Sequence, residues 1–281
     1  MSNTSAKTYK ELASPHFGEV FALIEAICKE QKIPVYLIGA HARIILQLEK
    51  GIQPMRGTKD IDFAVMIPDI ESYDAFMTEL EKAGFRKVQE PYRVIYDKTN
   101  TVVDMLPFGQ IAEEGTVKFT DRRTELSVVG MEEVLDGAIK IRHEGYDVKV
   151  PPLVGIMILK LISWREKPDR KKDLDDVFEI ISNYFEISKG SFYAEHLYIV
   201  DELNTDHFII EAGSFMIGKE MGEIIKEESV LRTSIMDIIK KEIEEEPGSI
   251  SLYFLQKEYF KDYTFIKRIF SLILKGLNDI V

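Results

Sequence analysis

The chain has 281 residues, enough for two modest domains, and 36 basic against 48 acidic residues give it a formal net charge of −12. Such an acidic chain is not a general nucleic-acid binder, so contact with RNA would need a local basic patch. A single cysteine excludes an internal disulfide, the polar N-terminus lacks a signal-peptide core, and no apolar run approaches membrane-spanning length. We therefore expect a cytoplasmic protein with no membrane partner.

Helical and strand patterns alternate through the first half of the chain. The spacing of apolar residues predicts helices near 17–31, 41–50, 71–83 and 131–139. Gly84 is expected to end the third of these helices. Short apolar runs predict strands near 35–39, 60–67, 86–90, 93–97, 101–107 and 146–150, and a short hairpin at 115–130.

The second half is predicted to be almost wholly helical. Apolar residues lie three and four positions apart through 153–164, 173–185 and 213–280. Pro151-Pro152 precedes this change of pattern and marks a boundary. The sequence thus predicts two domains, residues 1–150 with a mixture of helices and strands, and residues 151–281 with helices.

Two carboxylates, Asp60 and Asp62, lie two positions apart in the apolar run predicted as a strand at 60–67. Because side chains alternate along a strand, we expect both to point to the same side. Two neighbouring negative charges are costly to bury unless a cation neutralises them, and a divalent metal does this. The alternative is a structural pair of acids at a strand end or turn.

A third acid, Asp104, lies in the middle of the apolar strand at 101–107. A lone Asp in such a strand needs a partner. It is either a third metal ligand or half of an ion pair with a buried Arg or Lys. The earlier strand at 35–39 ends in Gly39-Ala40, small residues that let the backbone approach a ligand.

The order of these motifs resembles the nucleotidyltransferase superfamily with the polymerase-beta-like fold, and more narrowly the AbiEii-type nucleotidyltransferase toxins and their relatives. The resemblance covers roughly residues 33–185, and less clearly 212–225. The motifs that carry it are Gly39-Ala40-x-Ala42-Arg43, Arg56-x-Thr58-x-Asp60-Ile61-Asp62, Val103-Asp104-Met105-Leu106, Leu159-Lys160-Leu161-Ile162-Ser163-Trp164-Arg165 and Arg170-Lys171-Lys172-Asp173-Leu174-Asp175-Asp176.

The resemblance implies an α+β fold, with a mixed sheet flanked by helices and a helical C-terminal domain. It also implies Mg²⁺ or Mn²⁺ as cofactor and NTP as substrate. Asp60 and Asp62 would bridge two metal ions, and Asp104 would hold the metal that activates the attacking hydroxyl. Residues expected near the nucleotide are Gly39, Ala40, Arg56, Thr58, Lys160 and Asp173.

Several of these residues have simpler alternatives. Arg56 either braces a phosphate or forms a surface salt bridge, and Thr58 is either a phosphate contact or a β-branched residue at a strand start. Lys160 either contacts a nucleotide phosphate, as the resemblance implies, or extends from an apolar helix face to water. We expect its substitution to leave the melting temperature nearly intact.

Asp173 is expected either to orient Lys160 or the substrate, or to cap the helix that begins near it. Asp175 and Asp176 are expected to be first-turn acids stabilised by the helix dipole. An adjacent basic cluster is either a solvated loop or a guide for a polyanion such as tRNA. It comprises Arg165, Lys167, Arg170, Lys171 and Lys172.

Three further features are predicted to be structural. Cys28 is expected to fill space on the buried face of a helix, and His41 to have no part in phosphate binding. The acidic run 242–246, which precedes Pro247, is expected to be a solvated helix end.

Three hypotheses for function remain from the sequence. The first is transfer of a nucleoside monophosphate from NTP to a hydroxyl of tRNA or protein, as a toxin with a cognate antitoxin. The second is modification of a small molecule, as in antibiotic nucleotidyltransferases. The family usually carries Gly-Gly or Gly-Ser where this chain has Gly39-Ala40. The third hypothesis is therefore a nucleotide-binding module that no longer catalyses.

Overall fold

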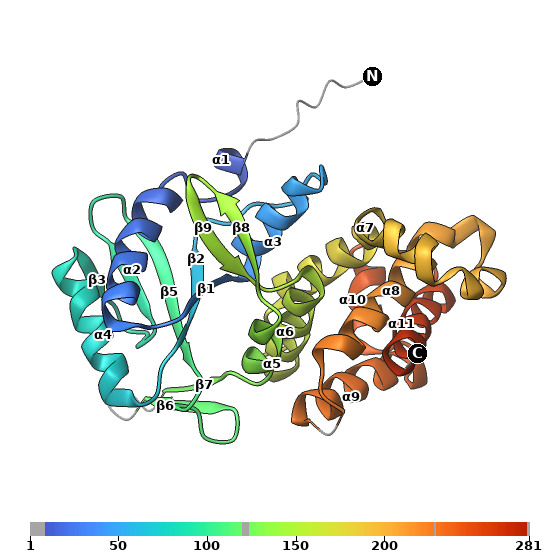
Figure 1. Ribbon diagram of the computed structural model, residues 1–281. Helices are drawn as coiled ribbons and strands as arrows, with labels where there is room; N and C mark the ends of the chain where they lie inside the picture. The colour runs from blue at the N-terminus through green and yellow to red at the C-terminus, as the bar shows by residue number, and fades with distance from the viewer. Residues whose placement is uncertain (1–8, 120–123, 228, 280–281) are drawn as a thin grey trace. The chain divides into compact units, whose positions relative to one another are not determined.

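A computed structural model describes residues 9–119, 124–227 and 229–279 of the chain (Figure 1). The chain divides into two compact units, residues 1–152 and 153–281. Unit 1 combines helices and strands, and unit 2 is helical. The predicted α+β class, with a mixed sheet flanked by helices and a helical region after it, is confirmed.

Unit 1 contains a five-stranded sheet with the strand order β1-β2-β5-β4-β3 (Figure 1). Strands β2 and β5 are parallel, and every other neighbouring pair in this sheet is antiparallel, which makes the sheet mixed. The strands are β1 (Val35–Ile38), β2 (Ile61–Met66), β3 (Phe85–Lys87), β4 (Arg93–Tyr96) and β5 (Thr101–Phe108). The helices of this unit are α1 (Tyr9–Leu12), α2 (Phe17–Gln31), α3 (Gly39–Glu49), α4 (Ile70–Lys82) and α5 (Met131–Asp136).

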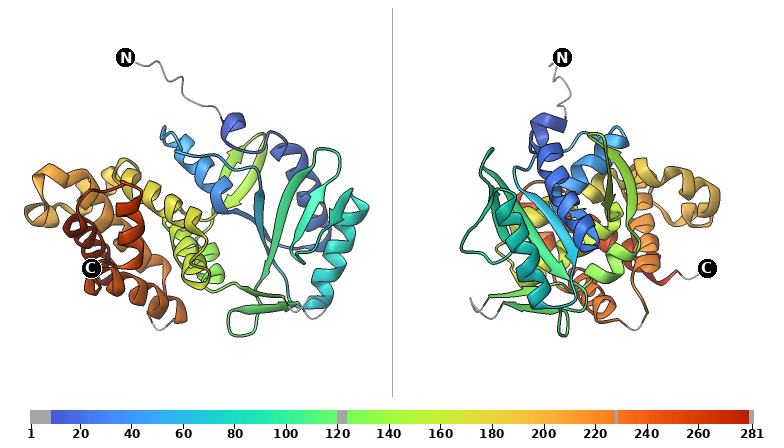
Figure 2. Two further views of the ribbon diagram at one scale, coloured as in Figure 1. Left: turned by 180° about the vertical axis from the view of Figure 1, so that it is seen from behind. Right: turned by 60° about the vertical axis from the view of Figure 1, so that its left-hand side comes forward.

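Helices α2 and α4 cover one face of this sheet, and α4 is seen beside the strands in Figure 2. The rings of Phe17 and Phe21 in α2 stack on Phe63 of β2. The hydroxyl of Tyr73 in α4 donates a hydrogen bond of 2.8 Å to the carbonyl oxygen of Met105 in β5. Because side chains alternate along a strand, the residues next to Phe63 and Met105, including Asp62, point to the opposite face.

Two hairpins complete unit 1. Strands β6 (Thr116–Phe119) and β7 (Thr124–Ser127) pair antiparallel, which confirms the predicted hairpin within the described residues. Strands β8 (Ile139–His143) and β9 (Tyr146–Val150) form the other hairpin. β8 was not predicted, and the helix expected to reach residue 139 ends at Asp136. The reason is that only Ile141 of β8 is buried, so this strand has almost no apolar pattern.

The remaining predicted elements of unit 1 match the structure closely. α2 has the predicted bounds, and α4 ends at Lys82, two residues before Gly84. Gly84 has a φ of +96°, the left-handed conformation expected of a glycine that ends a helix. Cys28 is buried in α2, and burial raises the pKa of its thiol to about 12. Its predicted role as an apolar filler is confirmed.

Unit 2 consists of helices joined by short connections. The α-helices are α6 (Leu153–Glu166), α7 (Lys171–Glu195), α8 (Phe208–Ile224), α9 (Val230–Glu244), α10 (Ser249–Gln256) and α11 (Tyr263–Asn278), with 3₁₀ turns η1 (Leu197–Glu202) and η2 (Thr205–His207). The helical pattern predicted for 213–280 therefore belongs to four separate helices. Within the described residues, no helix has both the length and the apolarity to cross a membrane.

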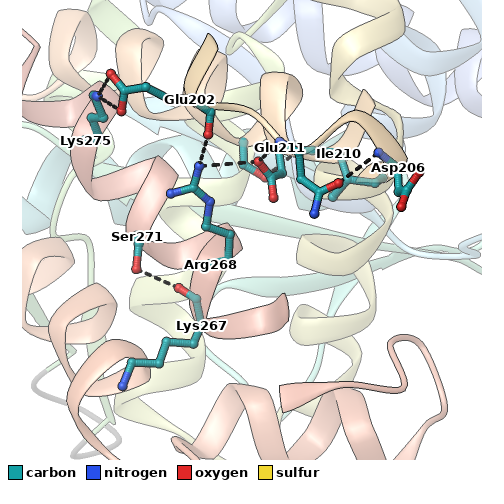
Figure 3. A network of polar contacts seen from close by, with 10 residues as sticks. Glu202, Asp206, Ile210, Glu211, Lys267, Arg268, Ser271 and Lys275 are labelled. Carbon is teal, nitrogen blue, oxygen red and sulfur yellow. Dashed lines mark hydrogen bonds and ion pairs between the residues drawn. The ribbon is translucent and has the colours of Figure 1, made fainter. Parts of the chain in front are cut away.

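A polar network ties the η1–η2 segment to α11 (Figure 3). Arg268 of α11 donates to the carbonyl oxygen of Glu202 at 2.6 Å and lies 3.4 Å from the carboxylate of Glu211. Glu211 is buried, and it also accepts a hydrogen bond of 2.9 Å from the backbone of Asn204. Lys275 forms an ion pair with Glu202. Charged groups thus help to hold the 3₁₀ connection before α8, together with the buried side chains of Ile199 and Leu203.

Helices α8 and α11 cross at glycines. A methyl group added to Gly276 of α11 would lie 2.2 Å from the carbonyl oxygen of Phe215 in α8. One added to Gly218 of α8 would lie 2.1 Å from the carbonyl oxygen of Ile273 in α11. Both distances are well inside van der Waals contact, so the close backbone approach requires glycine on both helices.

We predict that Gly276→Ala destabilises the protein by at least about 1–3 kcal/mol, because the two helix backbones must move apart. Gly190→Ala is the matched control, since Gly190 lies in α7 and has no atom within 4 Å of an added methyl group. In an exposed helix this substitution is expected to stabilise by about 0.5–1 kcal/mol. Urea unfolding followed by circular dichroism measures both, and equal effects would contradict the tight crossing.

Candidate active site

One row of residues crosses four strands on the sheet face opposite α2 and α4. Ile38 of β1 pairs with Asp62 of β2, Asp62 pairs with Asp104 of β5, and Asp104 pairs with Arg93 of β4. Residues paired across neighbouring strands point to the same face and lie about 5 Å apart. The row therefore places two carboxylates side by side, with a guanidinium next to the second one.

Arg93 holds Asp104 with two hydrogen bonds. Its Nε lies 2.7 Å from Oδ1 of Asp104, and its Nη2 lies 2.9 Å from Oδ2. The side chain of Asp104 is 11% exposed and that of Arg93 is 33% exposed. The hydrogen bond with Asp104 raises the pKa of Arg93, and the charges of Asp104, Asp60 and Glu90 add to the effect. The ion pair expected as one alternative for Asp104 is therefore present.

Arg93 was not among the site residues predicted from the sequence. The available signal was an arginine at the start of a predicted apolar strand, together with the need of the buried Asp104 for a partner. Joining the two required the strand order, because β4 and β5 are neighbours only once the sheet is known.

Asp62 lies against the first residue of α3. Gly39 has a φ of +68°, and a methyl group added to it would lie 2.3 Å from Oδ2 of Asp62. Only glycine combines this backbone conformation with this proximity. Because Gly39 is also the N-terminal residue of α3, the helix dipole stabilises a negative charge at this position. Ala40, which follows it, is buried.

Asp60 does not join this row. Strand β2 begins at Ile61, so Asp60 lies just before the strand, not within it, and it is exposed. The expectation that Asp60 and Asp62 share one strand is thus wrong, because the strand pairing starts one residue later. In the part of the chain that the structure describes, no group of three or more His, Cys, Asp and Glu side chains is arranged to hold a metal ion.

The pair Asp62 and Asp104 nevertheless fits a divalent cation. Mg²⁺ is commonly held by one or two carboxylates together with substrate phosphates and water. Each carboxylate oxygen has two acceptor positions, and Arg93 occupies one on each oxygen of Asp104. Oxygen acceptors therefore remain on Asp104 beside the neighbouring carboxylate of Asp62.

Backbone contacts hold the loop before β2. The backbone N–H of Thr58 donates a hydrogen bond of 2.7 Å to the carbonyl oxygen of Leu12. The carbonyl oxygen of Arg56 accepts a contact of 3.5 Å from the buried guanidinium of Arg43. The Thr58 hydroxyl donates to the carbonyl oxygen of Asp60 at 3.4 Å. These contacts assign Arg56 and Thr58 a part in shaping the loop that carries Asp60.

His41 is a buried core residue. Its ring stacks on Phe17, it is fully buried, and it forms a hydrogen bond with the backbone of Asp60. Burial and the nearby His143 lower the pKa of His41 to about 3, so the ring is neutral at pH 7. The structural role expected for His41 agrees with this position.

In unit 2, Lys160 of α6 lies between two acids of α7. Its Nζ is 2.7 Å from Asp173 and 3.1 Å from Asp176. Arg170 also contacts Asp173, at 2.7 Å. Burial alone would raise the pKa of Asp173, but the charges of Lys160 and Arg170 outweigh it, so the pKa is lowered. The expected pairing of Asp173 with Lys160 is present.

Other expectations for α7 are wrong. The helix begins at Lys171, so Asp173 lies in its first turn and does not cap it. Asp176 lies beyond the first turn and is fully buried against Lys160, so it is not the first-turn acid that was expected. Asp175 accepts hydrogen bonds of 2.6 and 2.9 Å from the hydroxyls of Tyr253 and Tyr259. All three acids have partners from other parts of the unit, which spacing along one helix cannot reveal.

The acidic run 242–246 is not wholly solvated either. Glu242 is 2% exposed, and its carboxylate accepts hydrogen bonds from the backbone N–H groups of Ile250 and Ser251 and from the Ser251 hydroxyl. Burial raises the pKa of Glu242 despite these bonds. This acid fixes the start of α10. The residues of the basic cluster at 165–172 are exposed, but Arg165 lies in α6 and Lys171 and Lys172 lie in α7, so only part of the cluster is a loop.

No protein-family model matches the sequence, and no curated protein sequence matches it significantly. Similar solved structures include ANT(2'')-Ia in complex with adenylyl-2''-tobramycin, at 15% identity and a TM-score of 0.38 over 63% of this chain and 97% of that one. An antigenic nucleotidyltransferase-like protein from Paracoccidioides brasiliensis aligns at 16% identity and a TM-score of 0.41, over 72% and 94% of the two chains. The lincosamide antibiotic adenylyltransferase LnuA, with bound lincomycin, aligns at 14% identity and a TM-score of 0.35, over 58% and 94%. These values do not establish membership of a family.

We predict that Gly39→Ala destabilises the protein more than Gly51→Ala does. Both glycines have a positive φ, +68° and +73°, so both substitutions cost about 1–2 kcal/mol of backbone strain. Only the methyl group at position 39 meets a carboxylate, because position 51 has open space around it. Adding Asp62→Ala to Gly39→Ala should recover the extra loss in urea unfolding. No recovery in this double variant would contradict the close contact.

The ion pairs of Lys160 also change its expected substitution result. Lys160→Met leaves two buried carboxylates without their shared cation, so we predict a loss of about 3–5 kcal/mol in the free energy of unfolding. The control Lys189→Met removes an exposed pair with Glu186 and should cost less than about 0.5 kcal/mol. An unchanged melting temperature for Lys160→Met would contradict a stabilising role of these ion pairs and favour a Lys160 side chain that extends to water.

Proposed function

We propose that this chain is a metal-dependent nucleotidyltransferase that moves a nucleoside monophosphate from NTP to a hydroxyl group. The observation that carries the proposal is the placement of Asp62 and Asp104 at paired positions of two parallel strands, with Gly39 in close contact with Asp62. Two adjacent carboxylates on one sheet face provide oxygen ligands at a spacing that a divalent cation can bridge.

Asp62 and Asp104 are the proposed metal ligands, and Asp60 is proposed to complete the set from the loop before β2. A bound Mg²⁺ or Mn²⁺ would supply charge stabilisation for the attacking and leaving oxygens of an in-line displacement. Asp104 would also accept the proton of the attacking hydroxyl. Arg93 donates only one hydrogen bond to each oxygen of Asp104, so each oxygen keeps a second acceptor position. Gly39 leaves room at the start of α3 for the carboxylate of Asp62 to lie against the backbone.

The domain roles follow from the same proposal. Residues 1–150 would form the catalytic domain and residues 151–281 the helical domain. Lys160 is proposed to contact a nucleotide phosphate, with Asp173 holding its ammonium in place at 2.7 Å. Arg56 and Thr58 are proposed to help bind the nucleotide from the loop that precedes β2, together with Gly39 and Ala40.

For the acceptor we propose a hydroxyl of tRNA or protein, as in the AbiEii-type toxins that the sequence resembles, with a cognate antitoxin. The exposed basic cluster at 165–172 is a local site for a polyanion in an otherwise acidic chain. Without internal disulfides the chain suits a reducing compartment, and we propose the cytoplasm. There are two alternatives: the acceptor is a small molecule of the antibiotic type, or the protein binds nucleotide without catalysis. An activity assay distinguishes them.

The decisive experiment incubates the protein with α-labelled NTPs, Mg²⁺ or Mn²⁺, and one of three acceptors: total RNA, total cell protein, or hydroxyl-bearing antibiotics. Label on RNA or protein supports the proposed acceptor. Label on the antibiotic alone would replace it with a small-molecule substrate. NTP binding without any transfer would identify a nucleotide-binding module, and neither binding nor transfer would overturn the proposal.

We predict that Asp62→Asn reduces transfer by more than about 100-fold, since a metal ion supplies several kcal/mol of transition-state stabilisation. Asn has the same shape as Asp, so the fold should persist. Asp97→Asn is the control, because Asp97 is an exposed acid of the same unit that pairs only at the surface with Arg86. Equal activities of the two variants would remove Asp62 from the site.

A further inference from the structure

Arg93 is the cationic residue in the row of paired positions that also contains Asp62 and Asp104. It faces Asp104 from the neighbouring antiparallel strand and contacts both of its oxygens, at 2.7 and 2.9 Å. Such a bidentate contact fixes both the position and the plane of a carboxylate. Asp104 is therefore held in one orientation before any other ligand arrives.

Arg93 offsets part of the negative charge of this row. Asp62 and Asp104 are paired across two parallel strands, so their negative charges repel each other. One guanidinium offsets one of these two charges. The negative charges of Asp60 and Glu90 also interact favourably with Arg93, in addition to that of Asp104. A divalent cation at the two aspartates would supply the same compensation.

We propose that Arg93 is the counter-ion of the metal site in the absence of metal. It holds Asp104 in position, and it competes with a divalent cation for the carboxylates of Asp62 and Asp104. The inference rests on the proposed function, and it concerns the control of metal binding at that site. A positive charge within a few ångströms of a bound cation weakens its binding, and does so more strongly at a site partly shielded from water. Arg93 thus makes Asp104 a positioned ligand and lowers the metal affinity of the empty site.

The conformational freedom of the two side chains favours this role. Arg93 is about one-third exposed, so its guanidinium can leave Asp104 toward water without repacking the core. Asp104 sits in the buried strand β5 and is far more restricted. When a metal ion binds, the arginine is therefore the partner that gives way.

The test measures Mn²⁺ affinity by calorimetric titration, without NTP, so that it does not depend on turnover. We expect Arg93→Met to bind Mn²⁺ at least about tenfold more tightly than the wild type, because the competing charge is removed. Arg93→Gln, which keeps a hydrogen-bond donor but no charge, should also bind more tightly and guards against poor folding of the Met variant. Arg93→Lys keeps the charge and should remain close to the wild type.

Arg86→Met is the matched control. Arg86 lies on β3, the strand beside β4, and its Nε lies 2.7 Å from Asp97, the same distance as in the Arg93 pair. Arg86→Met changes the net charge of the protein by the same amount as Arg93→Met but leaves the row intact. Its Mn²⁺ affinity should therefore stay within about twofold of that of the wild type. An equal gain in Arg86→Met and Arg93→Met would reduce the effect to net charge and overturn the inference.

Thermal melting adds a second readout. Without metal, Arg93→Met should melt below the wild type, because two neighbouring carboxylates lose their counter-ion, and Mn²⁺ should raise its melting temperature more than that of the wild type. If the wild type binds Mn²⁺ and the folded neutral variants bind it equally or more weakly, the inference fails while the proposed function stands. If no folded form binds Mn²⁺, both the inference and the metal-dependent function are wrong.

Discussion

The parallel pairing of β2 with β5, in the register that sets Asp62 beside Asp104, is the constraint on which the rest of unit 1 depends. The same register sets Phe63 beside Met105 on the other face, where α2 and α4 pack. A slip of one residue would bury a carboxylate under α2 and expose Phe63, at a cost that the core cannot offset. The apolar core therefore specifies the placement of the acids, although none of them contributes to it.

The sequence predicted the parts of this arrangement that depend on local pattern. Periodicity identified β2, β5 and the alternation that separates Asp62 from Phe63, and residue type identified Gly39 as a place of close approach. Arg93 was missed because its role requires the strand order, and Asp60 was misplaced because the strand starts one residue later than its apolar run suggests. β8 was missed because a strand with one buried residue has no apolar alternation to detect.

Long-range partners account for the errors in unit 2. Asp176 was expected to be a first-turn acid stabilised by the helix dipole, and Glu242 to belong to a solvated helix end. In the structure, Asp176 meets Lys160 from α6, and Glu242 accepts hydrogen bonds from the start of α10. The spacing of residues within one helix predicts which of them lie on the same face. It does not predict which neighbouring helix supplies a cation or backbone N–H groups to contact them. Buried acids are thus the feature that local reasoning is least able to place.

The two carboxylates of the row have different kinds of partner, and this difference gives them different freedom. Asp62 lies against the backbone of Gly39 and the first turn of α3, which cannot move without distorting the helix and β1. Asp104 is held by a side chain with several rotatable bonds and access to water. Under the proposed function, a rotamer change at Arg93 would accommodate a cation while the sheet, the helix and Asp62 stay in place. A rigid acid next to such an ion pair would let the same row exist with or without the proposed cation, at little conformational cost to the core.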